Sequence, residues 1–352
     1  MKPVLYPKNQ RIFNTSNGIG VLADCETCKC TEVLNKEYEL VMELPVNGIN
    51  VDRLEPDCII LEKPNYTDGI QPFRIYDIEQ NIDGMLKVSA AHISYDAAGI
   101  PVLPFTATSL AEVESKVNTE RILTKESELT FVAKFDADGE FKLSEPKSLK
   151  AIIGDGSDTI IGVYGGEVHY NGFQIELLEK RGEDKGICFR YRKNITDFEM
   201  EKNSEEAYSA VIGYWKKSGS NGSEDTIIQG SIITIDANCE YDKILLLDVS
   251  DKIKNENDAD ATPEQINEYV RTQIDSGEIG AIKYNMKIDY TEDDDVIKVN
   301  LGDLVGVLLP EMNIKASGRC RKVVFDCLLE RNESIEIGQV SAGLSQDLAE
   351  VV

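Results

Sequence analysis

Alternating apolar and polar residues, the pattern of half-buried β-strands, recur along most of the chain. Residues 37–44 are a clear case, in which every second position is a large apolar residue: Tyr38, Leu40, Met42 and Leu44. Residues 70–78 alternate in the same way, and an Asp-Gly turn at 83–84 separates them from a further strand through residues 86–90. We therefore expect residues 1–98 to form a β-barrel-like domain of antiparallel strands.

Residues 99–159 mix helical and strand patterns. A helix is expected after Ser109, whose hydroxyl can cap it. The apolar face of that helix consists of Leu110, Val113 and Val117. Residues 135–141 carry an Asp-Gly pair between two apolar segments, which predicts a hairpin. A second short helix is expected after Ser144, ending at Gly154. These patterns predict an α/β element with two short helices.

Residues 160–250 return to strand patterns and are similar to the first block in length and texture. Asn171-Gly172 predicts a hairpin turn, residues 181–184 a longer turn, and the polar residues 217–225 a flexible loop. The strands expected in this block are residues 159–163, 167–170, 174–178, 186–191, 209–215, 227–235 and 243–247. We predict a second β-barrel-like domain over 160–250.

Residues 251–352 contain the clearest helical signal of the chain, at 262–276. Thr262 and Gln265 form a capping box, and Gly277 follows the last apolar position. Residues 282–290 then alternate as a half-buried strand. An α/β C-terminal domain with closing strands is expected here, and the domains need not be continuous in sequence. The predicted fold class for the 352 residues is α+β, β-dominated and multidomain.

The charge balance is strongly acidic. The chain has 63 acidic and 37 basic residues and a formal net charge of −26. Such a surface repels phosphate, and the tightest basic cluster is only Arg190, Arg192 and Lys193, so specific nucleic-acid binding is not expected. There is no apolar run of about 18 residues for membrane insertion and no apolar segment of a secretory signal at the N-terminus. We expect a soluble protein made in the cytoplasm, with reduced thiols.

Candidate catalytic residues are few, because the chain has only two histidines, His92 and His169. Both lie on strand-like segments, where a hydrogen-bonded or surface histidine is the ordinary case. The chain has no Gly-x-Ser-x-Gly elbow, and no cysteine lies in a recognisable nucleophile context. We predict no catalytic residue.

Metal and cofactor sites are not expected either. Cys25, Cys28 and Cys30 lack the second ligand pair of a zinc site, so an exposed turn with free thiols is predicted, with zinc binding through distant loops as the alternative. Residues 136–139 lack the later ligands of a calcium loop, and the acidic run 292–295 is interpreted as a solvated turn. No phosphate-binding glycine loop occurs. No cofactor-binding or metal-binding residue is predicted.

Several short motifs together resemble a known protein family. In chain order they are Leu34-Asn35-Lys36-Glu37-Tyr38-Glu39-Leu40, Gln71-Pro72-Phe73-Arg74-Ile75-Tyr76, Ala91-His92-Ile93-Ser94-Tyr95-Asp96, Tyr164-Gly165-Gly166-Glu167, Arg181-Gly182 with Arg192-Lys193-Asn194-Ile195, Leu301-Gly302-Asp303 and Glu330-Arg331-Asn332-Glu333-Ser334-Ile335-Glu336-Ile337-Gly338. They resemble the phage tail-associated family (prophage endopeptidase tail or siphophage tail-tip proteins) in its N-terminal hub region, which is similar to the baseplate hub of contractile phages. The motifs are individually weak, but their order and spacing cover almost the whole chain.

The resemblance implies a structural subunit of a phage or prophage tail tip. Two barrel-like domains per subunit would form a pseudo-sixfold ring in a homotrimer that closes the tail tube. The implied partners are the distal tail protein hexamer, the tape measure protein and receptor-binding or lytic tail proteins. The implied location is the virion tail tip, after assembly in the cytoplasm of the bacterial host. Acidic residues lining the lumen would let DNA pass without binding.

Two other functions stay open at this stage. Many members of the family continue into a peptidase, lysin or fibre, and we expect no such activity here because those residues are absent from the 352. A tail-associated peptidoglycan-degrading peptidase would need a pocket around His92 or His169 with a partner carboxylate. A host cell-wall-binding protein would need exposed aromatic residues, and the chain has one tryptophan, Trp215.

Overall fold

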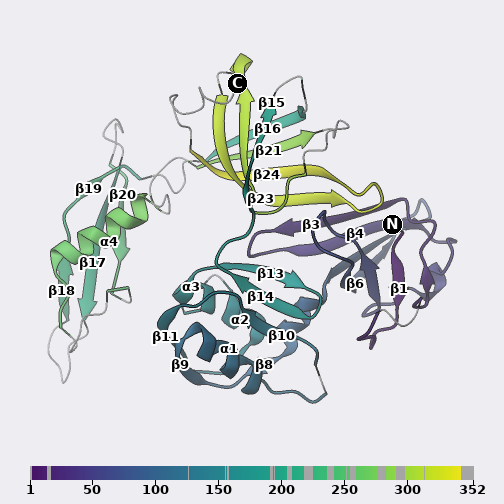
Figure 1. Cartoon of the computed structure of the whole chain (residues 1–352), viewed down its shortest axis with the longest axis horizontal. Coiled ribbons are helices and arrows are strands. Elements are labelled where there is room, and N and C mark those ends of the chain that lie inside the picture. Colours follow the sequence, from purple (N-terminus) through teal and green to yellow (C-terminus); the bar gives the residue numbers. More distant parts are fainter. Residues whose placement is uncertain are drawn as a thin grey trace. The chain divides into compact units, whose positions relative to one another are not determined.

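A computed structural model describes most of the chain and divides it into two compact units (Figure 1). The described residues are 2–13, 17–125, 127–154, 156, 158–190, 193, 195–203, 208–217, 225–235, 242–250, 252–253, 259–275, 279, 283–290, 298–312 and 314–341. Unit 1 comprises Met1–Phe198, Lys287–Ile337 and Ala342–Val352, and unit 2 comprises Glu199–Met286 and Gly338–Ser341. Strands outnumber helices in both units, so the predicted β-dominated α+β class is confirmed.

The largest sheet joins both ends of the sequence. Among the described residues it runs in the order β16-β21-β24-β23-β3-β4-β7-β6-β5-β1-β2, with β22 pairing β23 and β15 pairing β22. Its strands are β1 Val4–Tyr6, β2 Gly20–Val21, β3 Thr27–Val33, β4 Tyr38–Pro45, β5 Ile59–Glu62, β6 Gln71–Gln80, β7 Met85–His92, β15 Asp184–Arg190, β16 Ile195–Asn203, β21 Lys283–Tyr290, β22 Leu304–Leu309, β23 Ile314–Asp326 and β24 Arg331–Ser341. Short 3₁₀ helices are η1 Val51–Arg53, η2 Ile93–Gly99 and η4 Pro310–Met312.

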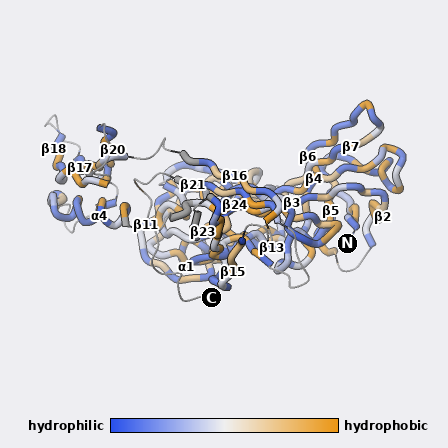
Figure 2. Tube along the Cα trace, turned by 90° about the horizontal axis from the view of Figure 1, so that it is seen from above, coloured by the Kyte–Doolittle hydropathy of each residue, from blue (hydrophilic) through white to orange (hydrophobic). Residues whose placement is uncertain are grey.

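Strand β23 connects the N-terminal strands to the C-terminal ones. Its residues 314–319 pair antiparallel with β22, and its residues 322–326 pair antiparallel with β3. The predicted alternation along β4 is confirmed, since Tyr38, Leu40, Met42 and Leu44 are all buried. Strands β6 and β7 form the predicted hairpin, and hydrophilic and hydrophobic residues alternate along them (Figure 2).

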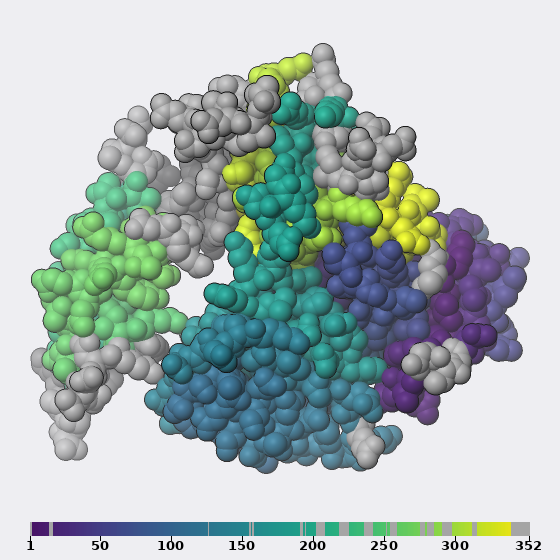
Figure 3. All heavy atoms as spheres, in the orientation of Figure 1, coloured from purple at the N-terminus to yellow at the C-terminus, as the bar shows by residue number. Residues whose placement is uncertain are grey.

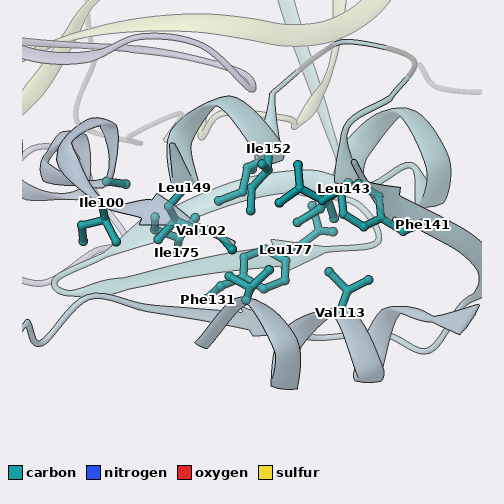
Figure 4. Close-up of a cluster of buried hydrophobic side chains, with 14 of the residues drawn as sticks. Ile100, Val102, Val113, Phe131, Phe141, Leu143, Leu149, Ile152, Ile175 and Leu177 are labelled. Atoms are coloured by element: carbon teal, nitrogen blue, oxygen red, sulfur yellow. The ribbon is translucent and has the colours of Figure 1, made fainter. Parts of the chain in front are cut away.

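A smaller α/β part of unit 1 lies between β7 and β15 in sequence. Its strands are β8 Pro101–Val102, β9 Phe105–Ser109, β10 Thr130–Ala133, β11 Asp138–Leu143, β12 Lys147–Ser148, β13 Glu167–Asn171 and β14 Gln174–Leu178. Its helices are α1 Leu110–Thr119, α2 Leu149–Ile153 and α3 Ile160–Tyr164. They enclose a core in which Val113 of α1 and Ile152 of α2 meet Phe131, Phe141 and Leu177 from three strands (Figure 4).

The local signals in this part are only partly confirmed. Ser109 caps α1 by accepting a hydrogen bond from the Glu112 backbone N–H, as predicted. The hairpin predicted at 135–141 is wrong, because β11 pairs antiparallel with β9 while β10 pairs parallel with β14. The second helix begins at Leu149, not after Ser144, because the Ser148 hydroxyl caps it.

The strand predicted at 159–163 is also wrong. Thr159 accepts a hydrogen bond from the Gly162 N–H and caps helix α3, and the short run of Ile160, Ile161 and Val163 fits one helical turn as well as a strand. The hairpin at Asn171-Gly172 does form, between β13 and β14, with Gly172 in the left-handed region. The strands of residues 160–250 contribute to three sheets, while the division of the chain at 98, 159 and 250 stays a prediction.

Unit 2 contains a small sheet and the longest helix among the described residues. The sheet comprises β17 Ala210–Lys217, β18 Thr226–Gln229, β19 Ile233–Thr234 and β20 Ile244–Asp248, and the helix is α4 Pro263–Asp275. Ile266 of α4 packs with Trp215 in the core of this unit. The predicted capping box forms, because the Thr262 N–H donates to Gln265 Oε1 and the Gln265 N–H donates to Thr262 Oγ1. Gly277 and Ile282, predicted to end the helix and begin a strand, lie outside the described residues.

Candidate functional site

A cavity of about 440 Å³ in unit 1 brings together charged side chains from distant parts of the sequence. They include Glu32, Asp68, His169, Arg181, Lys185 and Asp303. Strand β3, the loop after β5, strand β13 and residues 180–185 meet residues 299–303 around this cavity. In Figure 3, teal atoms from the region of about residues 170–200 lie against the yellow-green atoms of residues above 300. We call this set of charged residues, with Glu167, Glu176 and Arg319, the polar joint.

His169 is held between two carboxylates. The antiparallel register of β13 and β14 places it opposite Glu176, and its Nδ1 lies 2.8 Å from Glu176 Oε2. Its Nε2 lies 3.1 Å from Asp68 Oδ1. Burial lowers the pKa of His169, but the hydrogen bonds to Asp68 and Glu176 outweigh it, so the pKa is raised overall. Because each ring nitrogen faces a carboxylate oxygen, both can donate only in the protonated ring, the form that the raised pKa favours.

The hydrogen bonds around His169 also favour the charged forms of Asp68 and Glu176. Burial raises the pKa of Asp68 and of Glu176, but hydrogen bonds from His169, joined by Lys134 at Glu176, lower both overall. Asp68 is held in place by Asn65, which donates from Nδ2 to Asp68 Oδ2 at 2.9 Å. Asn65 Oδ1 accepts from the backbone N–H of Asp68 at 2.7 Å, an Asx-type turn that fixes the loop.

Arg181 and Glu32 form a nearly buried ion pair. Arg181 Nη1 donates to Glu32 Oε1 at 2.7 Å, and the two side chains are 10% and 7% exposed. The same Nη1 also donates to the carbonyl of Val168, at 3.2 Å. Burial of two charges costs free energy that the pair offsets only when its hydrogen bonds are complete. This pair connects β3 to the segment after β14.

Arg319 of β23 makes the second major link. Its guanidinium contacts both carboxylate oxygens of Glu167, with Nη2 donating to Oε2 at 2.9 Å. Nη2 also donates to the Arg181 carbonyl at 2.7 Å, and the Arg181 N–H donates to Glu167 Oε2 at 2.6 Å. Burial raises the pKa of Glu167, but the hydrogen bonds from Arg319 and from the Arg181 backbone lower it overall. A bidentate arginine–carboxylate pair fixes orientation as well as distance.

Asp303 completes the polar joint. Its side chain is fully buried, and its Oδ1 accepts from the Glu183 N–H at 2.9 Å. Its Oδ2 accepts from Lys185 Nζ at 2.9 Å and from the Asn300 N–H at 2.8 Å. The backbones at Gly182 and Gly302 approach so closely that a Cβ on Gly182 would lie 2.0 Å from the Gly302 carbonyl carbon. Both glycines have positive φ, so only glycine fits at either position.

The polar joint is suited to holding segments together. Each histidine nitrogen faces a carboxylate, so His169 has no free nitrogen to act as a base or metal ligand. Among the residues that line the cavity, Thr67 carries the only hydroxyl, and none is a serine or cysteine. In the described part of the chain, no group of three or more histidine, cysteine or acidic side chains is placed to hold a metal ion.

His92 lies apart from the polar joint, in the core. It is fully buried, accepts from the Ser94 N–H at Nδ1 and lies 3.3 Å from Gln71 Oε1 at Nε2. Burial lowers its pKa to about 3, so the ring is neutral. Its ring stacks on Tyr38 at 4.8 Å between centroids. The expectation of a hydrogen-bonded strand histidine agrees with this position.

The cysteine prediction is corrected. Cys25, Cys28 and Cys30 do not lie in an exposed turn, since all three are buried and the last two lie on β3. Hydrogen bonding with the thiols of Cys25 and Cys327 raises the pKa of Cys28, and burial raises that of Cys30. Residues alternate between buried and half-buried along β3, and this alternation turns the thiols of Cys28 and Cys30 inward. The close spacing of the cysteines suggested a turn instead of this strand pattern.

Two predicted charged segments are described only in part or not at all. Arg190 and Lys193 of the basic cluster are described, whereas Arg192 and the acidic run 292–295 lie outside the described part.

Two further features are described. Asp138-Gly139, predicted as a turn, opens strand β11 at a register shift. None of the helices in the described part is long and apolar enough to span a membrane.

The sequence reasoning missed the partners that form the polar joint. Arg181-Gly182 and Leu301-Gly302-Asp303 stood out as short motifs, but they lie about 120 residues apart and no local pattern pairs them. The structure brings them together through the two glycines and Asp303. A glycine beside a charged residue in both motifs was the available signal.

Comparisons with known proteins identify the fold. No protein-family model and no curated protein matches the sequence. Among solved structures, the prophage tail protein gp18 from Listeria monocytogenes EGD-e is similar at 12% identity and TM-score 0.62, over 97% of this chain and 95% of that one. A tail protein from Neisseria meningitidis MC58 matches at 10% identity and TM-score 0.59, covering 97% of both chains. The 43 kDa tail protein of prophage MuSo2 from Shewanella oneidensis matches at 11% identity and TM-score 0.58, over 97% of this chain and 98% of that one.

Proposed function

We propose that this chain, which has the fold of prophage tail proteins, is a structural subunit of a phage or prophage tail tip and closes the tail tube as a trimeric hub. The observation that carries the proposal is the end-to-end likeness to three tail proteins, each covered over at least 95% of its length. The expected family resemblance in the sequence motifs agrees with it. At these low identities the likeness itself concerns the fold.

The large sheet supports a ring-forming role. Strand β23 joins the N-terminal strands β1–β7 to the C-terminal group of β15, β16, β21, β22 and β24 in one hydrogen-bonded sheet. In a homotrimer, two strand groups per subunit would give six around the axis, which suits contact with a hexameric ring. The polar joint supports the same role, because its ion pairs hold the segments that they connect at a fixed angle to one another. The wall of a ring must keep that angle constant.

The proposed partners follow from this placement. The hub would dock on the hexameric distal tail protein, lie next to the tape measure protein and carry receptor-binding or lytic tail proteins. Its lumen would form the exit channel for DNA, and the net charge of −26 would keep phosphate from binding there. The protein would be assembled in the host cytoplasm and end in the virion tail tip.

The proposal is tested by the mass of the purified full chain. Mass photometry should give a particle of three 39.1 kDa chains, and this particle should bind the purified distal tail protein of the same phage or prophage. A monomer that stays monomeric in the presence of the distal tail protein would contradict the hub.

One observation favours a second candidate function, a tail-associated peptidoglycan-degrading peptidase. His169 lies at a cavity of about 440 Å³ with Asp68 and Glu176 as partner carboxylates, as such an enzyme would need. Against this second function, both imidazole nitrogens already hydrogen-bond to carboxylates, so neither is free to act as a base. Release of peptides from purified peptidoglycan by the wild type, abolished in His169→Ala, would favour the enzyme over the scaffold.

A further inference from the structure

One end of the N-terminal strands exposes large aliphatic side chains on short turns. Ile82, in the turn between β6 and β7, is fully exposed, and Ile49 is 60% exposed in the segment after β4. Val21 and Val46 at the same end are 44% and 39% exposed. Strands β6 and β7 run to this turn at the end of the unit (Figure 2). We call Val21, Val46, Ile49 and Ile82 the apolar tip.

The turns that carry the apolar tip are tied to one another. The Val46 N–H donates to the Gly84 carbonyl at 2.9 Å, which joins the segment after β4 to the β6–β7 turn. The Ile49 N–H donates to Asp24 Oδ2 at 2.8 Å, and Asn50 Nδ2 donates to the Val21 carbonyl at 2.9 Å. These side chains are therefore presented on fixed backbone. A group of exposed aliphatic residues that forms one patch marks an interaction site more often than single scattered residues do.

Acidic side chains surround the apolar tip. The exposed acids at this end are Asp24, Glu26, Glu43, Asp52 and Asp83, and the basic residues are Lys2, Arg53 and Lys87. Lys87 lies 4.0 Å from Glu79, which adds a further acid to this end. A symmetric contact with a second copy would place this acidic rim on itself, which repulsion disfavours. An apolar recess bordered by lysine and arginine is the complementary surface.

We propose that the apolar tip is the docking surface of this chain for a partner protein that presents an apolar recess with a basic rim. The inference rests on the proposed function, because in a tail-tip hub the protein that receives this end would be the ring of the distal tail protein. Ile49 and Ile82 would enter the recess, and the acids would face its basic rim. Binding should weaken as salt concentration rises, because the rim charges are exposed.

The test uses the full chain and the purified distal tail protein of the same phage or prophage, with binding measured by biolayer interferometry. Ile49→Ser combined with Ile82→Ser should weaken binding about tenfold or more, since two buried aliphatic side chains would be lost from the contact. Glu26→Lys combined with Asp52→Lys should weaken it and flatten its salt dependence. The matched control is Ile122→Ser combined with Leu329→Ser, which removes aliphatic residues of 48% and 60% exposure elsewhere and should leave binding unchanged.

Each result decides the inference. All three variants should keep the melting temperature and mass of the wild type, because the replaced side chains are exposed. Equal binding by the tip variant and the wild type would overturn the docking surface and leave the hub standing. A wild-type trimer with no affinity for the distal tail protein would also overturn it. Self-association that disappears in the tip variant would assign the apolar tip to copies of this chain instead.

Discussion

At the residue scale, the polar joint depends on charges that are removed from water and paired. Glu32 and Arg181 are 149 positions apart in the sequence and meet at 2.7 Å. His169 sits between two carboxylates, and Arg319 spans both oxygens of Glu167. In such a network the loss of one partner costs more than the pair contributes, because the remaining charge is left buried.

Replacing Arg181 tests this cost. Arg181→Met should lower the free energy of unfolding by about 3–5 kcal/mol, because the buried carboxylate of Glu32 loses its cation. The double variant Arg181→Met with Glu32→Gln should recover much of that loss. Urea denaturation followed by circular dichroism measures both. A double variant no more stable than Arg181→Met alone would show that the two side chains are not coupled.

His169 predicts a pH dependence of stability. Its pKa is raised in the folded state, so its contribution is fully present below its ordinary pKa of about 6.5 and is lost as the pH rises through the folded value. The lowered pKa values of Asp68 and Glu176 matter at acidic pH, because the stability that these carboxylates contribute is lost as the pH falls through their folded pKa values. The difference in melting temperature between the wild type and His169→Gln should therefore be larger at pH 6 than at alkaline pH. A melting-temperature difference that does not change with pH would show that His169 is not stabilised in its protonated form.

At the element scale, the sequence predicts what is local. Alternation located β4, β6 and β7, and side-chain caps located α1 and α4, because these signals lie within a few residues of the element. The parallel pairings of β10 with β14 and β15 with β22 could not be predicted, because nothing local selects the partner strand. The failed hairpin at 135–141 has this cause. Most of the polar joint was hidden in the same way, since its Glu32–Arg181, Glu167–Arg319 and Asp303–Lys185 pairs join segments far apart in the sequence. The pair of His169 with Glu176, which lies across the β13–β14 hairpin, is the exception.

The close approach of Gly182 and Gly302 is an element-level constraint that can be tested. Gly182→Ala should destabilise the protein by several kcal/mol, because its Cβ would overlap the Gly302 backbone and its φ is positive. Gly186→Ala is the matched control, because Gly186 also has a positive φ but has open space around its Cβ position. The control should lower the free energy of unfolding by about 1 kcal/mol, measured by thermal or urea denaturation. Similar costs at both positions would mean that the backbone contact is unimportant.

At the scale of the whole molecule, one large sheet and the polar joint hold distant segments of unit 1 together. The sheet joins segments near both ends of the sequence through β23. The polar joint links that sheet to β13, β14 and the residues that follow them. The fold is shared with three tail proteins over nearly their whole length. The ion pairs of the polar joint hold these segments of unit 1 together.

The most direct test of the tail hub is to locate this chain in the particle. Cryo-electron microscopy of tails from the phage or induced prophage, with the chain tagged, should show three copies arranged around the axis at the tip of the tube, next to the distal tail ring. Copies spaced along the tube, or tails whose tips lack the chain, would contradict the account.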